Sequence, residues 1–241
     1  MKKLAILILS TALIFNYSCT LEEDPPFLAN ENVFSNADSA VKALDGIYSS
    51  MTQYFYYASS YHTLFTVSSG MCFTKRGGNS PDSVYNLTVG SLDVGSGSVD
   101  LGRVWKGAYR IIGRANDAIA SITPSENPVD SDQTTINDVL GQAYFVRAHT
   151  YFNLVRAWKE VPLRLTPTTS ETINLAVSSE QEIYDQIIAD CNSALAYMSN
   201  SLPSHYPKSY AVNMLLAKVY MQLAGNDGSS QYWQMAYDHA M

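Results

Sequence analysis

The strongest pattern in the chain is a helical one that extends over residues 136–159. Apolar side chains recur there every three to four residues, which is the period of one helix face, at Leu140, Tyr144, Ala148, Tyr151, Val155 and Trp158. The segment Val161-Pro162-Leu163 then continues in an extended form, because a residue that precedes proline disfavours the helical region. The pattern predicts a long amphipathic helix whose apolar face is covered by neighbouring helices.

Weaker patterns of the same period predict helices over 35–51, 104–122, 179–198 and 209–224, and one that starts near Ser230. Two of these open with the Ser-x-x-acid spacing of a capping box, Ser35 with Asp38 and Ser179 with Glu182. Gly225 is a suitable end for the fourth of them. Met241 follows an apolar helical pattern without a stop signal, so we expect a truncated chain that lacks its C-terminal part.

These patterns predict an all-α fold of tetratricopeptide-like antiparallel helix pairs, in which stacked neighbours bury one another's apolar faces. A generic helical bundle is the open alternative. Between positions 54 and 102 the helical period disappears into tyrosines, glycines, serines and asparagines, which predicts a long irregular loop excursion. Loops of this length in compact domains are usually functional or disordered.

The N-terminus reads as a lipoprotein signal peptide over residues 1–18. Lys2 and Lys3 precede an apolar run that is too short to span a bilayer, and Ser18 stands directly before Cys19. The end of this segment resembles the lipobox of bacterial lipoproteins, which predicts lipidation of Cys19 and anchoring at the outer membrane. An ordinary secreted protein with an incidental cysteine is the alternative.

Residues 19–34 form an acidic, proline-containing tether that we expect to stay solvated, ahead of a helical domain over 35–241. The acidic run looks like the surface-export signal of Bacteroidetes lipoproteins, although a plain charged spacer explains it equally well. Removal of residues 1–18 takes away two of the 15 basic residues and none of the 22 acidic ones, so the formal charge changes from −7 to −9. Such a charge argues against nucleic acid as a partner.

No pattern in the chain points to an enzyme, a metal site or a cofactor. The four histidines lack ligand spacing, and neither a phosphate-binding loop nor a nucleophile elbow is present. Paired carboxylates for glycoside hydrolysis come together only in the tertiary structure, so a hydrolase stays an open alternative. Cys72 and Cys191 are too few for a disulfide framework, and Cys191 falls on an apolar helix face, which favours a buried free thiol.

Several of these segments together resemble the SusD/RagB family of nutrient-binding outer-membrane lipoproteins. The match is clearest over 141–156 with its Val-Pro-Leu exit, where Gln-Ala-Tyr-Phe-Val-Arg-Ala-His-Thr-Tyr-Phe-Asn-Leu resembles the family's Ala-x-Phe-x-Arg-Ala-x-x-Tyr-Phe-x-Leu helix. Further matches are Trp105, Tyr109, Ile112 and Asn116 in one helix and the segment 211–220 in another. With the lipobox, the resemblance covers nearly the whole mature chain.

The resemblance implies a surface lipoprotein that binds a nutrient, most often an oligosaccharide and in some members a peptide. It also implies a partner, a SusC-like TonB-dependent transporter, to which the protein delivers the ligand without changing it chemically. Residues 74–78 resemble a Thr-Arg-Gly segment near the family's ligand face, which makes candidate ligand-binding residues of Arg76, Asn79, Asp82 and Tyr85. A solvated loop without ligand contact is the alternative for each of them.

The aromatic residues elsewhere have two interpretations. Tyr54, Phe55, Tyr56, Tyr57 and Tyr61 form the densest aromatic cluster, which either packs into the core, as their spacing favours, or forms an exposed binding patch. Trp105 and Trp158 lie on apolar helix faces and are expected to be structural. For the chain as a whole, a tetratricopeptide-like scaffold that binds only protein, or a peptide-binding lipoprotein without affinity for glycans, is the alternative function.

Overall fold

The computed structural model describes residues 33–34, 36–69, 99–125 and 130–241. Its helices are α3 (Ala37–Met51), α4 (Ser60–Ser68), α6 (Val99–Ser121), α7 (Ser131–Trp158), α8 (Glu180–Tyr197), α9 (Ser209–Ala224) and α10 (Tyr232–Ala240). The only β-type pairing within the described residues is an isolated antiparallel bridge between Val161 and Ser178. The predicted all-α class is confirmed.

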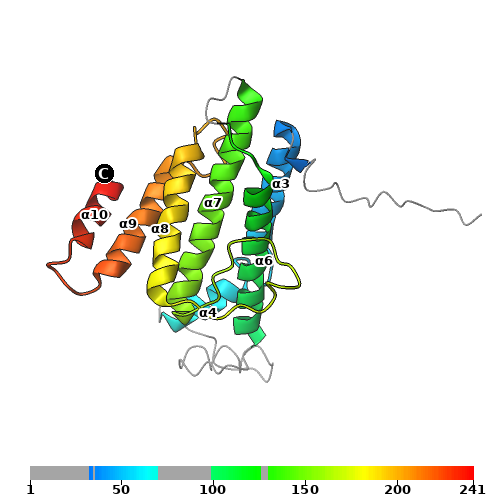
Figure 1. Cartoon of the computed structure of the whole chain (residues 1–241). Coiled ribbons are helices and arrows are strands. Elements are labelled where there is room, and N and C mark those ends of the chain that lie inside the picture. The colour runs from blue at the N-terminus through cyan, green and yellow to red at the C-terminus, as the bar shows by residue number, and fades with distance from the viewer. Residues whose placement is uncertain (1–32, 35, 70–98, 126–129) are drawn as a thin grey trace, which may run out of the picture.

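Helices α6 to α10 lie side by side in chain order, and consecutive members run antiparallel, whereas α3 packs against α6 and α7 and α4 lies across one end of the array (Figure 1). Helix α7 is the centre of the array, because it packs against α3, α6 and α8. Most of its apolar face is covered: Tyr151 and Val155 have no exposed surface, whereas Tyr144 and Trp158 are half-buried. This succession of antiparallel pairs is the tetratricopeptide-like arrangement that the sequence predicts.

Local signals fix most of the helix ends. In α8 the capping box is complete, since the Glu182 N–H donates to Ser179 Oγ and the Ser179 N–H donates to the Glu182 carboxylate. Helix α9 ends where Gly225 takes a φ of 56°, a left-handed value that glycine adopts without strain. Both ends agree with the sequence-based prediction.

Three predicted boundaries are wrong. The N-cap of α3 is Asn36 rather than Ser35, because the Asn36 side chain accepts the Ser39 N–H at 2.9 Å. Helices α6 and α7 each begin five residues earlier than predicted, at Val99 and Ser131. The first turn of α7 is polar and at least partly exposed, and the first turn of α6 has only Val99 and Leu101 as apolar residues, of which Val99 is exposed, so no apolar period marks either start.

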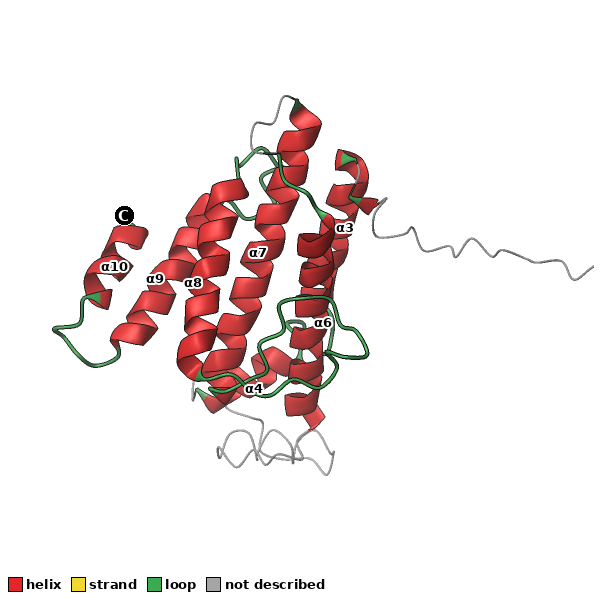
Figure 2. Cartoon of the chain, viewed as in Figure 1, coloured by secondary structure: helices red, strands yellow, loops and turns green. Residues whose placement is uncertain are grey.

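Part of the segment 54–102, which the sequence predicts as an irregular excursion, is helical, and residues 70–98 of it lie outside the described residues. Helix α4 occupies part of it, and α6 has already begun at position 99. Helix α4 packs across the start of α6, at the end of the array where α7 ends and α8 begins (Figure 2). Its apolar and polar residues do not separate into two faces, which is why the helical period is not visible in the sequence.

The aromatic cluster divides between core and surface. Tyr56 is buried, whereas 59% of the Tyr54 surface and 46% of the Phe55 surface are exposed. Trp105 and Trp158 pack edge to face with ring centroids 5.4 Å apart, which gives both a part in packing, and both keep part of their surface exposed. Cys191 is a buried free thiol. In the part of the chain that the structure describes, no helix has both the length and the apolarity for crossing a membrane.

Candidate functional site

The residues predicted for lipidation and ligand binding lie outside the described ranges. This holds for Cys19, Arg76, Asn79, Asp82 and Tyr85, and also for Cys72. The described chain on either side of the candidate ligand segment ends with α4 and resumes with α6. The search for a site within the structure therefore begins at the surface around the first half of α6.

A loop over residues 161–178 crosses the outer side of α6 and is held there by hydrogen bonds from the helices (Figure 1). The Tyr109 hydroxyl donates to the Pro162 carbonyl at 2.7 Å. The Tyr151 hydroxyl donates to the Arg164 carbonyl at 2.9 Å and accepts the Arg164 N–H at 2.6 Å. These bonds fix the first part of the loop against α6 and α7.

A buried polar network holds the same loop from the inside. The Arg147 guanidinium donates twice to the Asp190 carboxylate, at 2.8 and 2.7 Å, and also to Asn116 Oδ1 at 2.8 Å. The Asn116 amide in turn donates to the carbonyls of Arg164 and Thr166, both at 3.1 Å. The two family-motif residues Asn116 and Arg147 thus position the loop, and a buried ion pair of this kind is tolerated because its donors are satisfied.

Between this loop and α6 lies a cavity of about 360 Å³ that we call the aromatic hollow, lined by Trp105, Tyr109, Pro162, Arg164, Thr168, Ile173, Asn174 and Leu175. The Trp105 and Tyr109 rings are 5.0 Å apart at their centroids. The Arg164 guanidinium donates to the carbonyls of Thr172 and Ile173, and these hydrogen bonds join the first and second halves of the loop that lines the hollow. Flat rings next to amide and hydroxyl groups suit a ligand with an apolar face and many hydroxyls.

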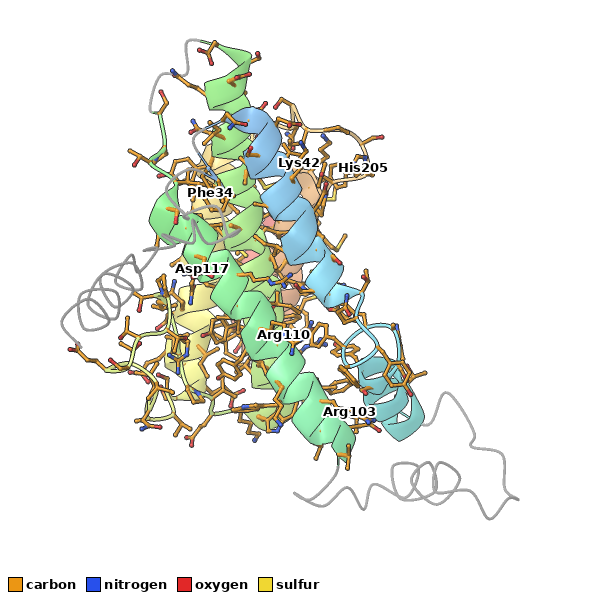
Figure 3. All side chains as sticks on the ribbon, turned by 90° about the vertical axis from the view of Figure 1, so that its right-hand side faces the viewer. Phe34, Lys42, Arg103, Arg110, Asp117 and His205 are labelled. Carbon is orange, nitrogen blue, oxygen red and sulfur yellow. The ribbon has the colours of Figure 1, made fainter. Side chains whose placement is uncertain are left out.

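On the other side of α6 is a second cavity, of about 280 Å³, that we call the cationic groove, lined by Ser50, Gln53, Phe55, Tyr56, Arg103, Lys106, Gly107 and Arg110. The turn after α3 forms one wall and α6 the other. This turn approaches α6 closely at Gly107, where an added Cβ would lie 3.2 Å from the Tyr56 ring. Figure 3 shows Arg103 and Arg110 along the side of α6 that faces the viewer.

A third polar cluster joins α4 to α7 and is structural. Asn153 is its centre, because its amide donates to the Tyr57 hydroxyl at 2.7 Å while its carbonyl accepts from Tyr61 and from Arg156. The Tyr57 hydroxyl lies 3.5 Å from His149 Nδ1. Burial, reinforced by the positive charges of Arg156 and Lys218, lowers the pKa of His149 to about 4, so this histidine is neutral at pH 7.

The described residues contain no group of three His, Cys, Asp or Glu side chains that could hold a metal ion. Sequence reasoning missed Arg164 and Asn174 of the aromatic hollow, and it missed the cations of the cationic groove. A signal for the cations was available, because Arg103, Lys106 and Arg110 recur at the spacing of one helix face. No comparable signal existed for the loop residues, whose position depends on tertiary contacts with α6 and α7.

Comparison with known proteins gives one consistent result. Residues 29–221 match the SusD-like family model described as "Starch-binding associating with outer membrane". The chain is 28% identical to SusD-like protein P2 of Formosa agariphila over 225 residues, which are 92% of this chain and 43% of that protein. The chain thus spans less than half the length of this curated relative.

Solved structures agree at the level of the fold. A SusD homolog from Bacteroides thetaiotaomicron superposes with a TM-score of 0.66 at 21% identity, over 87% of this chain and 41% of that one. A laminarin-binding SusD-like protein gives the same TM-score of 0.66 at 22% identity, over 84% of this chain and 42% of that one. The helical array therefore occurs as one part of larger relatives.

Proposed function

The chain belongs to the SusD-like family, and on that premise we propose that it is the helical part of a cell-surface lipoprotein that binds an oligosaccharide. The observation that carries the proposal is the match of the family model to residues 29–221, since that model is described by starch binding and association with the outer membrane. The laminarin-binding relative with the same fold supports a glucan-like ligand. In this proposal the protein captures its ligand and does not transform it.

The aromatic hollow is the described surface best suited to contact such a ligand. A pyranose presents a C–H face that packs on flat rings, and Trp105 and Tyr109 supply these rings. Asn174 and Thr168 on the loop supply polar groups for the hydroxyls. The network around Arg147 and Asn116 keeps the loop in place before the ligand arrives, which lowers the ordering cost of binding.

We propose further that Arg76, Asn79, Asp82 and Tyr85 contact the same ligand from the segment between α4 and α6. Support comes from the position of this segment in the chain, because α6 begins after it and carries part of the lining of both cavities. The double variant Arg76→Ala/Asp82→Ala should lower the affinity of the full-length protein for its oligosaccharide. Unchanged affinity would show that these residues lie in a solvated loop that does not contact the ligand.

The proposal also includes a membrane anchor and a partner. Lipid chains on Cys19 would hold the body at the outer membrane, and residues 19–34 would provide the tether. The partner would be a SusC-like TonB-dependent transporter that accepts the captured ligand. A peptide ligand, or a scaffold that binds only the transporter, is the alternative function.

Titration calorimetry of the full-length protein with laminari-oligosaccharides tests the proposed function. We expect heat of binding, and an affinity about tenfold lower in Trp105→Ala, because a ring that stacks on the ligand contributes about 1.4 kcal/mol. Asn174→Ala is the second variant, since this exposed loop residue can be removed without disturbing the core. Tyr210→Ala is the matched control, because 70% of this tyrosine is exposed and it lies on α9, away from both cavities.

A further inference from the structure

The cationic groove is a concentration of positive charge in a chain whose formal charge is −7. Arg103 is paired with Asp100 at 3.1 Å, and the same carboxylate accepts the Ser60 hydroxyl. Among the described residues, neither Lys106 nor Arg110 has a carboxylate within 4.0 Å. Both side chains are exposed, so within the described part of the chain their charges line the groove without a carboxylate partner.

The walls of the groove are preformed. At one end the Arg114 guanidinium donates to the Gly46 carbonyl and to Ser50 Oγ, both at 2.6 Å, which fixes α3 against α6. At the other end the Arg103 guanidinium lies over the Phe55 ring, 5.2 Å from its centroid. The exposed cations between these two contacts are therefore presented on a rigid surface.

These features together identify the kind of ligand. Two unpaired cations favour an anion, and the exposed Phe55 ring beside them favours a ligand that also has an apolar face. Nucleic acid and anionic membranes are poor candidates, because the rest of the chain is strongly acidic. A sugar that carries a carboxylate or a sulfate ester meets both requirements.

We propose that the cationic groove is a second ligand subsite, which binds the acidic sugar units of an anionic oligosaccharide through Lys106 and Arg110. This inference rests on the proposed function and deepens it, because it gives the oligosaccharide acidic units in addition to the neutral units that pack in the aromatic hollow. It separates the roles of the two cavities on α6. The aromatic rings of the hollow pack on neutral sugar units, and the cations of the groove bind acidic sugar units.

The test is calorimetric titration of the full-length protein with oligogalacturonate, with its uncharged methyl ester, with a sulfated carrageenan oligosaccharide and with neutral laminari-oligosaccharide. We expect an acidic probe to bind more tightly than the methyl ester, with an affinity that falls as salt is added. In Lys106→Gln/Arg110→Gln that affinity should fall by at least about tenfold, because two charge-assisted hydrogen bonds are lost. Binding of the neutral oligosaccharide should be unchanged.

The control variant is Lys42→Gln/Lys218→Gln, which removes the same charge from exposed positions on α3 and α9. It should retain the affinity for the acidic probe. The subsite is overturned, and the proposed function kept, if only neutral probes bind or if the groove variant binds the acidic probe as tightly as the wild type. Absence of binding to all four probes would count against both the subsite and the proposed function.

Discussion

Arg147 and Asp190 form a buried two-point ion pair between α7 and α8, with nitrogen–oxygen distances of 2.7 and 2.8 Å. Only 4% of Arg147 and 1% of Asp190 is exposed. Asn116 Oδ1 and the Leu165 carbonyl accept further guanidinium protons. The pair therefore joins two helices and, through Asn116, holds the loop that walls the aromatic hollow.

Asp190→Ala should destabilise the protein by about 3–5 kcal/mol, because it leaves the Arg147 charge buried without its partner. Urea unfolding followed by circular dichroism measures this change. Asp38→Ala is the control, since Asp38 pairs with Lys42 at the surface with 79% of its side chain exposed. Its effect should stay below about 1 kcal/mol. Similar losses in the two variants would contradict the structural role of the buried pair.

Gly141→Ala should destabilise the contact between α7 and α8 by about 1–3 kcal/mol, because the core there is already filled. An added Cβ would lie 2.6 Å from Met198 Cγ and 3.1 Å from the Ala194 carbonyl oxygen. Gly113→Ala in α6 meets no atom within 4 Å and should instead stabilise by about 0.5–1 kcal/mol, as expected for glycine in a helix interior. Thermal unfolding of both variants gives the comparison, and the same sign in both would contradict this account of the packing.

The acid sensitivity of the fold should depend partly on His149. The pKa of His149 in the folded protein is lowered from 6.5 to about 4 by burial. As the pH falls below 6.5 the unfolded chain takes up a proton before the folded one does, so stability is lost between about pH 6.5 and 4. We expect this contribution to be on the order of 3 kcal/mol.

Unfolding free energies measured from pH 7 to 4 test this expectation. The variant His149→Gln should lack this part of the pH dependence, whereas His205→Gln should keep it, because His205 is exposed. An identical pH dependence in wild type and His149→Gln would show that the cluster around Asn153 does not disfavour protonation of the histidine.

Sequence patterns predicted those parts of the fold that depend on local signals. The capping box of Ser179 and Glu182 and the end of α9 at Gly225 are contained within a few residues, and both are confirmed. The starts of α6 and α7 and the whole of α4 were missed, because their residues show no apolar period. Their position depends on packing against helices that are distant in the chain.

The sequence predicted less of the candidate site than of the fold. The motif residues Asn116 and Arg147 indicated the family, but their role in holding the loop at Arg164 and Thr166 appears only in the tertiary structure. The aromatic hollow combines residues 105 and 174, which no local pattern connects. The predicted ligand residues from Arg76 to Tyr85 lie outside the described ranges and stay a prediction.

The variant Cys19→Ala should release the full-length protein in soluble form, because the proposed lipid chains can no longer be attached. Fractionation of cells that express wild type and variant provides the measurement. Ser18→Ala is the control, since it keeps a small residue before the cysteine and should leave the protein in the membrane fraction. A variant that stays membrane-bound would contradict the assignment of Cys19 as the anchor.

The most direct test of glycan capture is a glycan array probed with the full-length protein, followed by analysis of the bound glycan for new reducing ends. The account predicts binding to one class of oligosaccharide and recovery of that oligosaccharide intact. Absence of binding to every glycan would contradict the account and favour a protein scaffold or a peptide ligand, and newly formed reducing ends would identify a hydrolase instead.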